Sequence, residues 1–261
     1  LKLDRNQLRS DILPYHKALD HIEMIWNQHI KRAKNAIDFE ISIDETATAT
    51  NPKSHLFIAL ELKRRKISIS TLAPRFVGEF QKVIDYRGDI SLFEEDLKQH
   101  VAISESFRYL LSIHSGSDKF SIFPILGACI SGSFHIKTAG TNWLEAVRLV
   151  AQKDPELYRR LHEHSRRRFS DACAFYHVTT DIEAIEKLET VSDEKLPAFL
   201  DDDNARQMLH ITYGYLLEDE DENGNKRFKD ELFNLLAQEE LAYARLLENH
   251  IGKHLKLLGF K

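Results

Sequence analysis

The stretch Leu110 to Thr141 reads LLSIHSGSDKFSIFPILGACISGSFHIKTAGT, and it decides the fold class. It places His114 and His135 near the ends of two apolar, strand-like runs, and each run then gives way to small polar residues. A barrel or an open α/β sheet presents side chains to a substrate in this way, because the strand is rigid and the loop beyond its carboxyl end forms the pocket. The stretch therefore predicts an α/β enzyme.

Helical and strand-like segments take turns on both sides of this stretch. Apolar residues at alternate positions predict strands, and apolar residues three and four apart predict helices. Strands that alternate with helices are joined in parallel by crossovers. The predicted strands are residues 37–44, 67–72, 108–114, 134–137 and 172–179. The predicted helices are residues 19–36, 55–66, 90–107 and 142–152 with a capping box of Asn142 and Glu145, one that starts at Asp154 and Pro155, and a long amphipathic helix at 230–258.

The number of strands leaves the closure of the sheet open. About five strands are visible in the pattern, whereas a closed (β/α) barrel has eight. Either further strands escape the pattern, or the sheet is open, or the chain is the later part of a barrel. We predict one domain over residues 1–261 of the TIM-barrel type, complete or reduced to its later strands. The sequence begins with a residue other than methionine, within a charged stretch, which favours the interpretation that the chain is part of a longer protein.

Composition narrows the class of protein. A hydrophobic fraction of 43% in 261 residues is sufficient for a large core, and a net charge of -5 gives no reason to expect nucleic acid. No apolar run approaches the ~20 residues that cross a bilayer, and the segment LKLDRNQLRSDI lacks a signal-peptide core. Cys129 and Cys173 lie in apolar runs, which predicts buried, reduced thiols. We expect a cytoplasmic protein without a membrane partner.

Polar residues on shared strand faces predict a metal site. Side chains alternate along a strand, so the groups that share a face are Glu40, Ser42 and Asp44; Ser112 and His114; and His135 and Lys137. Two imidazoles and one carboxylate from neighbouring strands suit a divalent Zn, Mn, Fe, Co or Ni ion. We predict His114 and His135 as ligands, with Asp44, which the alternation favours, or Glu45 at the strand's end. The alternative is two hydrogen-bonded histidines beside a solvated acidic pair.

Four further charged residues are candidates for contact with a substrate. Lys137, Lys119 and Arg75 each offer a cation for a substrate carboxylate, and Asp118 offers an acid or base beside Gly116. For each of the four, the alternative is an ordinary surface charge.

Several segments resemble a known family. The stretches that carry the resemblance are EISIDET, HSGSDKFSIFP, FHIKTAGTNWLEAVR and ARQMLHITYGYLL. They are similar to the tagaturonate epimerase family, metal-dependent enzymes that interconvert tagaturonate and fructuronate in bacterial hexuronate catabolism. The resemblance runs from about residue 37 to the end of the chain and implies a (β/α) barrel and a divalent metal. It also implies that the chain corresponds to the carboxyl-terminal part of a longer enzyme.

The resemblance assigns roles to the candidates. Epimerisation at carbon 4 of a 2-keto uronate is expected to follow a retro-aldol route, in which the bond between carbons 3 and 4 breaks and re-forms. The predicted catalytic residues are Asp118 and Lys137, with Lys137 or Arg75 holding the uronate carboxylate. The predicted substrate-binding residues are Arg75, Ser115, Lys119, Thr138 and Thr141, and the predicted metal ligands are Asp44, Glu45, His114 and His135.

Two alternatives to the epimerase stay open. A related metal-dependent sugar isomerase or aldolase would use the same ligands on another substrate. A truncated, non-catalytic relative would act as an assembly module through its terminal helix. We expect a small sugar acid as partner and a homo-oligomer as the assembly.

Overall fold

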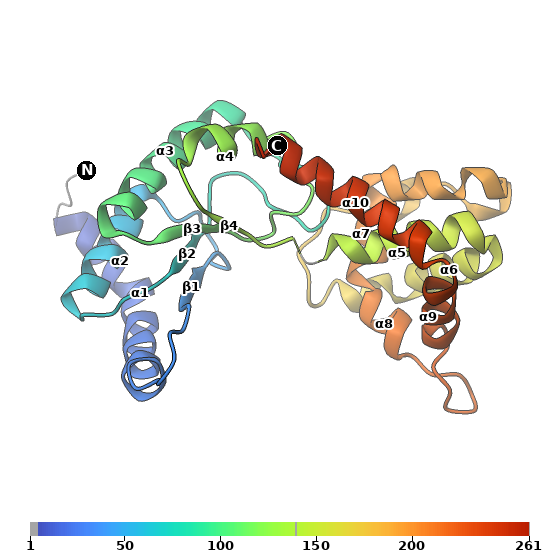
Figure 1. The fold of residues 1–261 in the computed structure, drawn as a ribbon, viewed down its shortest axis with the longest axis horizontal. Coiled ribbons are helices and arrows are strands. Elements are labelled where there is room, and N and C mark those ends of the chain that lie inside the picture. Colours follow the sequence, from blue (N-terminus) through green and yellow to red (C-terminus); the bar gives the residue numbers. More distant parts are fainter. Residues whose placement is uncertain (1–4, 139, 261) are drawn as a thin grey trace. The chain divides into compact units, whose positions relative to one another are not determined.

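Four parallel strands form the sheet of this computed structural model (Figure 1). The structure describes residues 5–138 and 140–260, with the backbone alone for residues 5–8 and 10–14. Residues 1–4 of the segment LKLDRNQLRSDI lie outside the described residues. The chain divides into two compact units. Unit 1 comprises residues 1–79, 87–116 and 124–137, and unit 2 comprises residues 80–86, 117–123 and 138–261.

The sheet belongs to unit 1 and confirms the prediction of parallel strands. Its strands are β1 (Glu40–Ile43), β2 (Thr71–Pro74), β3 (Leu110–Ile113) and β4 (His135–Ile136), in the order β1-β2-β3-β4. Glu40 pairs with Thr71, and Ser112 pairs with His135. This register brings the polar residues of neighbouring strands side by side on one face.

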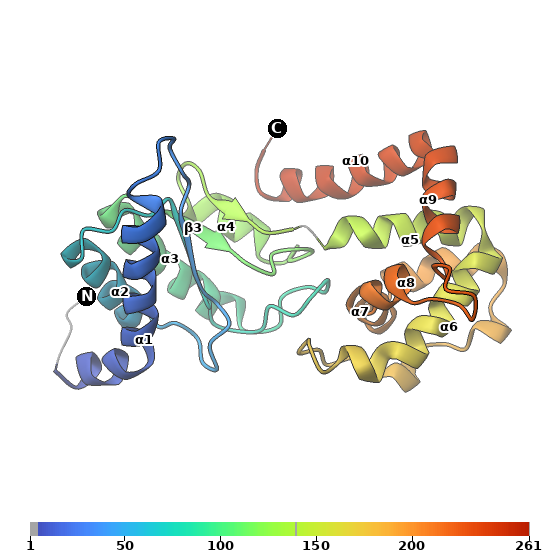
Figure 2. The ribbon, with the colours of Figure 1, turned by 90° about the horizontal axis from the view of Figure 1, so that it is seen from below.

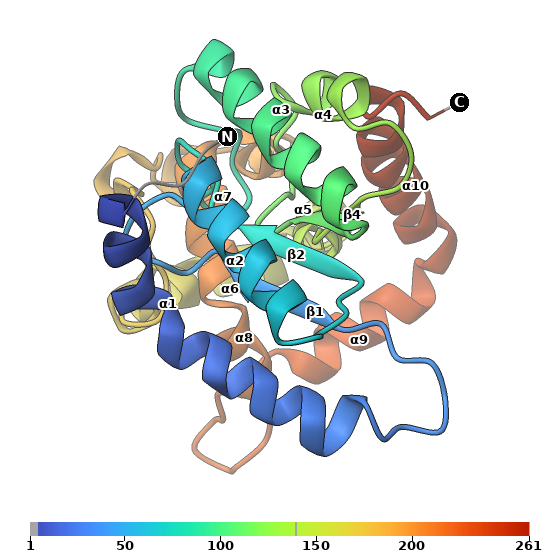
Figure 3. The same ribbon diagram turned by 90° about the vertical axis from the view of Figure 1, so that its left-hand side faces the viewer.

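The helices of unit 1 connect these strands and cover the sheet. They are α1 (Arg5–Ile25) with a π-helical turn at Trp26–Ile30, α2 (Pro52–Arg64), α3 (Ile90–Phe107) and α4 (Phe123–Cys129), whose first residue counts with unit 2. Asn51 caps α2 and Asp89 caps α3, because each side chain accepts hydrogen bonds from backbone N–H groups of the first turn. Helices α1, α2 and α3 pack in sequence (Figure 2), and α2 and α3 lie on the viewer's side of β1 and β2 (Figure 3).

Unit 2 is helical within its described residues. Its helices are α5 (Thr141–Lys153), α6 (Pro155–Ala172), α7 (Asp203–Ile211), α8 (Tyr213–Glu218), α9 (Lys229–Gln238) and α10 (Glu240–Leu257), with 3-10 turns at Ile182–Ala184, Leu188–Thr190 and Asp193–Asp201. Helix α10 runs along α5 (Figure 2), so residues a hundred positions apart come together. The core is formed by apolar faces of α5, α6 and α7, among them Val147, Leu161 and Met208.

Four expectations from the sequence are wrong. Residues 172–179 form no strand: α6 continues to Ala172, and Cys173 beyond it is exposed rather than buried. The segment 230–258 is two helices, since α9 ends at Gln238 and α10 begins at Glu240. No capping box of Asn142 and Glu145 opens α5, because that helix begins at Thr141 without a side-chain cap.

No helix among the described residues has both the length and the apolar character to span a membrane.

Candidate functional site

The polar face of the sheet in unit 1 gathers around one carboxylate, that of Glu40. Its Oε1 lies 2.8 Å from His114 Nε2, and its Oε2 lies 3.1 Å from His135 Nδ1. Thr71 donates a hydrogen bond of 2.7 Å to the same Oε2. Ser112 Oγ lies 2.8 Å from His135 Nδ1. The carboxylate therefore bridges His135 of β4 and His114, which directly follows β3.

Hydrogen bonds determine the charge of this carboxylate. Burial alone would raise the pKa of Glu40, but hydrogen bonds with Thr71, Ser112, His114 and His135 outweigh burial and lower the pKa to about 2. Glu40 is therefore ionised at neutral pH, and it presents a fixed negative charge to both imidazoles.

Of the two acidic residues predicted as metal ligands, one reaches the histidines. Asp44 follows β1 directly, and its Oδ1 lies 3.2 Å from His114 Nδ1. Ser42 donates a short hydrogen bond to the same oxygen. Glu45 is exposed in the turn after the strand. The structure thus brings Asp44, His114 and His135 to one face through Glu40, and it leaves Glu45 outside this set.

Arg75 and Lys137 also belong to unit 1. Arg75 follows β2, and its guanidinium donates to the carbonyl of Thr46 in the loop after β1. Lys137 follows β4, and its side chain is exposed. Within the described residues its ammonium makes no hydrogen bond or ion pair, while its backbone forms hydrogen bonds with Ile113 and Gly116. Ser115 is half-buried with a left-handed backbone at φ 49.

Lys119 and the threonines belong to unit 2. The Lys119 ammonium is fully buried and donates to the carbonyls of Gln81, Ile84 and Ser117 at 2.8, 2.5 and 2.9 Å. Burial lowers its pKa to about 7. Its three donors are all used, so a contact with substrate, which stays a prediction, would require one of these bonds to break. Thr141 is buried and donates to the carbonyl of half-buried Thr138 at 3.1 Å.

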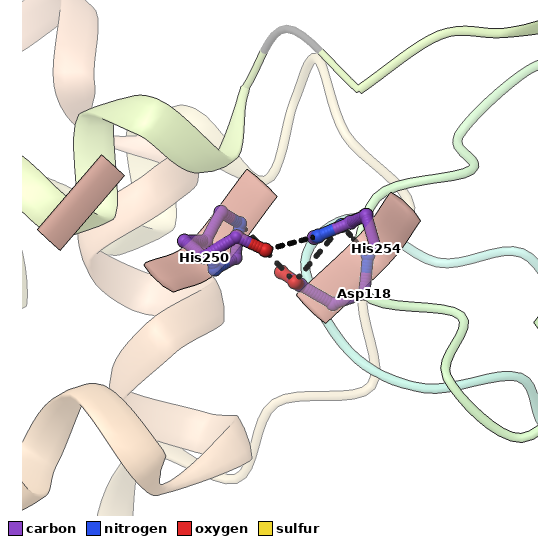
Figure 4. Close-up of side chains that lie close together, drawn as sticks. All are labelled: Asp118, His250 and His254. Atoms are coloured by element: carbon purple, nitrogen blue, oxygen red, sulfur yellow. Dashed lines mark hydrogen bonds and ion pairs between the residues drawn. The ribbon is translucent and has the colours of Figure 1, made fainter. Parts of the chain in front are cut away.

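Asp118 lies in a buried cluster of unit 2 that includes two histidines of α10 (Figure 4). Its side chain is only 4% exposed, and its Oδ2 accepts a 2.6 Å hydrogen bond from Arg206. Its Oδ1 lies 3.4 Å from His250 Nε2 and 3.5 Å from His254 Nε2. Burial raises the pKa of Asp118, and burial lowers that of His250 to about 3. The arrangement places the ion-paired carboxylate of Asp118 beside neutral His250.

Sequence reasoning missed three of these residues. Glu40 lies on the same strand face as Asp44, and the period of two was a sufficient signal for it. His250 and His254 are four apart in a predicted helix and so share one helix face. That spacing was a usable signal for a pair of histidine ligands, but only the fold shows that Asp118 joins them.

Comparison with known proteins gives one consistent result. A family model described as tagaturonate epimerase, UxaE, matches residues 1–258. A curated relative named tagaturonate/fructuronate epimerase, from Thermotoga maritima, is 39% identical over 259 residues, which are 99% of this chain and 52% of the relative.

Solved structures agree with the sequence comparison. The native crystal structure of fructuronate-tagaturonate epimerase UxaE from Cohnella laeviribosi has 50% identity and a TM-score of 0.98, covering 100% of this chain and 53% of that one. A crystal structure of the same enzyme with one glycerol gives 51% identity and a TM-score of 0.97, covering 99% of this chain and 53% of that one. The chain thus spans about half the length of the relatives it matches.

Proposed function

Because the chain belongs to the tagaturonate epimerase family, we propose that it contributes the face of Glu40, His114 and His135 to a metal-dependent epimerase that interconverts tagaturonate and fructuronate. The observation that carries the proposal is the single carboxylate that contacts both predicted histidine ligands. The barrel predicted for this family, and a single domain over residues 1–261, are parts of the same proposal. So are the location in the cytoplasm and the homo-oligomer.

The side-chain types on this face suit a divalent ion, although the ligand atoms of Glu40, His114 and His135 do not all lie within 4.8 Å of one another. Two imidazoles and an ionised carboxylate are the donor set that Zn, Mn, Fe, Co and Ni accept. His114, His135 and the carboxylate of Glu40 would hold the ion. Asp44 lies beside His114 Nδ1 and would either orient the imidazole ring or bind the ion itself. The bound ion would supply Lewis acidity for the negative charge that develops on the ketone and hydroxyl oxygens of the substrate.

Inversion at carbon 4 then follows from bond cleavage rather than from removal of the carbon 4 hydrogen, which is not acidic. A base takes the proton of the carbon 4 hydroxyl, the bond between carbons 3 and 4 breaks, and its electron pair passes to the enediolate. The aldehyde rotates, the bond re-forms on its other face, and the proton returns. We propose Lys137 or Asp118 for the proton, and Lys137 or Arg75 for the uronate carboxylate.

The remaining predicted contacts complete the proposal. Ser115, Thr138 and Thr141 are hydroxyl side chains for hydrogen bonds with the sugar acid, and Lys119 and Glu45 keep their predicted roles as substrate and metal contacts.

The test is the conversion of tagaturonate by this chain, followed by NMR with divalent metal and then with a chelator. We expect fructuronate to form only with metal. His114→Gln and Glu40→Gln are expected to lower the rate at least about 10-fold to 100-fold, since loss of such groups has this effect on metal sites. His177→Gln, an exposed histidine of unit 2, is the matched control. Metal-independent turnover would contradict the metal role, and metal binding without turnover would contradict the epimerase role for this chain.

A further inference from the structure

We propose that Asp118, His250 and His254 form a binding site for one zinc-like divalent ion, separate from the face that contains Glu40. The residues come from two distant segments of unit 2, namely the loop after β3 and helix α10. Figure 4 shows their three side chains facing one another. One ligand atom from each residue lies within 4.8 Å of the others, and among the described residues this is the group of three that meets that condition.

The distances correspond to tetrahedral coordination. Ligand atoms ~2.0–2.2 Å from a tetrahedral ion lie about 3.3–3.6 Å from one another. Asp118 Oδ1 is 3.4 Å from His250 Nε2 and 3.5 Å from His254 Nε2. These separations are longer than ordinary hydrogen bonds, and they match two edges of such a tetrahedron. A fourth position would be left for water or for another ligand.

A second polar group lies beside each of the three ligand residues. His254 Nδ1 lies 2.8 Å from the carbonyl of His250, which fixes the proton on Nδ1 and turns Nε2 toward the cluster. His250 Nδ1 lies 3.6 Å from Glu145 Oε1. Asp118 Oδ2 accepts from Arg206, which leaves Oδ1 for the ion. Histidine ligands of metals are oriented in this way by carbonyls and carboxylates on the far ring nitrogen.

Among the described residues, two of the facing atoms, Asp118 Oδ1 and His250 Nε2, are buried and have no hydrogen-bond partner. Their side chains are 4% and 10% exposed. A buried polar atom that makes no hydrogen bond costs about 1–3 kcal/mol, and two such atoms aimed at one point are what a bound cation would satisfy. The third ligand atom, His254 Nε2, accepts a 3.2 Å hydrogen bond from the backbone N–H of Asp118, which the ion would replace.

Arg206 adjusts the charge of the cluster. Two carboxylates lie at the cluster and each is paired with an arginine: Asp118 with Arg206 at 2.6 Å, and Glu145 with Arg148 at 3.3 Å. This proposal assigns Asp118 a role as metal ligand in place of the acid–base role, so the two assignments can be separated by experiment.

The test is a titration of the chain with Co²⁺, whose visible absorption is strong in tetrahedral sites and weak in octahedral ones. We expect strong bands that saturate at one equivalent in the Glu40→Gln variant, in which the face in unit 1 is altered. The bands should disappear in Glu40→Gln/His254→Asn. They should persist in Glu40→Gln/His162→Asn, which replaces another buried histidine of unit 2.

A second variant keeps the test decisive where His254→Asn does not fold. His250→Cys places a thiolate at the ligand position, and a thiolate bound to Co²⁺ adds a charge-transfer band in the near ultraviolet. We expect that band in His250→Cys and not in the unaltered chain, which already contains Cys129 and Cys173. Its absence in a folded His250→Cys, or strong visible bands that survive in Glu40→Gln/His254→Asn, would overturn the proposal. Loss of turnover in Glu40→Gln bears only on the proposed epimerase.

Discussion

Replacement of Arg206 by methionine tests how unit 2 holds its buried carboxylate. Arg206 donates to Asp118 Oδ2 at 2.6 Å, to the carbonyl of Val83 at 3.0 Å and to that of Leu200 at 2.6 Å. The two side chains of the ion pair are 11% and 4% exposed. Methionine fills a similar volume but donates nothing, so Asp118 is left as a buried charge without its partner.

The expected loss in the free energy of unfolding is about 3–5 kcal/mol, the cost of removing one partner of a buried ion pair. Arg206→Lys retains the charge but has one ammonium for three separated acceptors, and it should cost about 1–3 kcal/mol. Asp118→Asn removes the charge that Arg206→Met leaves unpaired. The double variant should therefore lose about 1–3 kcal/mol less than the sum of the two single variants.

Tryptophan fluorescence during urea unfolding, with a chelator present, measures these changes. The chain has two tryptophans, Trp26 in unit 1 and Trp143 in unit 2. Trp143 lies on α5, and its indole donates to the carbonyl of Leu209 at 3.0 Å. In a Trp26→Phe background its signal therefore reports on unit 2. A loss below about 1 kcal/mol in Arg206→Met, or additive effects in the double variant, would refute the ion-pair reasoning.

Two further predictions concern pH and packing. Burial lowers the pKa of His162 and of His210 to about 4, whereas both histidines have a pKa near 6.5 in the unfolded chain. The stability contributed by the two neutral histidines is therefore complete above pH 6.5 and is lost as the pH falls toward 4. Urea midpoints between pH 7 and 4 should fall less steeply in His162→Gln, and an unchanged slope would count against the assignment. Gly116→Ala would place a Cβ 2.4 Å from Ile136 Cγ2 and should destabilise by about 1–3 kcal/mol. Gly214→Ala in α8 meets nothing within 4 Å and should stabilise by about 0.5–1 kcal/mol, so calorimetry of the two variants should give melting temperatures that move in opposite directions.

Segments with a complete local signal were predicted closely from the sequence. Residues 90–107 were predicted as a helix, and α3 has the same bounds, since Asp89 caps its start and Arg108 ends it with a left-handed backbone. The parallel sheet followed from the alternation of two periods. For β2 the alternation in ISISTL was read as residues 67–72, whereas the strand is Thr71–Pro74, because pairing with β1 and β3 rather than pattern sets its register.

Errors arose where distant residues decide the local structure. The apolar run 172–179 suggested a strand, but its first residue completes α6, and exposed Phe175 has no strand to pair with among the described residues of unit 2. Residues 230–258 have continuous helical spacing, yet the chain breaks at Glu239, which pairs with Lys153 of α5 at 2.9 Å. Glu145 was predicted to cap α5, but it lies beside Arg148 at 3.3 Å and His250 instead. Two of these partners are distant in sequence, because Lys153 contacts Glu239 and His250 lies beside Glu145.

The two carboxylates most relevant to function differ in what sets their pKa values. Hydrogen bonds from four side chains lower the pKa of Glu40, so this group stays ionised and suits a fixed ligand for a cation. Burial raises the pKa of Asp118, the direction expected of a group that exchanges protons near neutral pH. A bound cation at Oδ1 would reverse that direction, because a positive charge favours the ionised form. Asp118 therefore acts either as a metal ligand or as an acid–base group, and the Co²⁺ spectrum of His250→Cys distinguishes the two roles without reference to turnover.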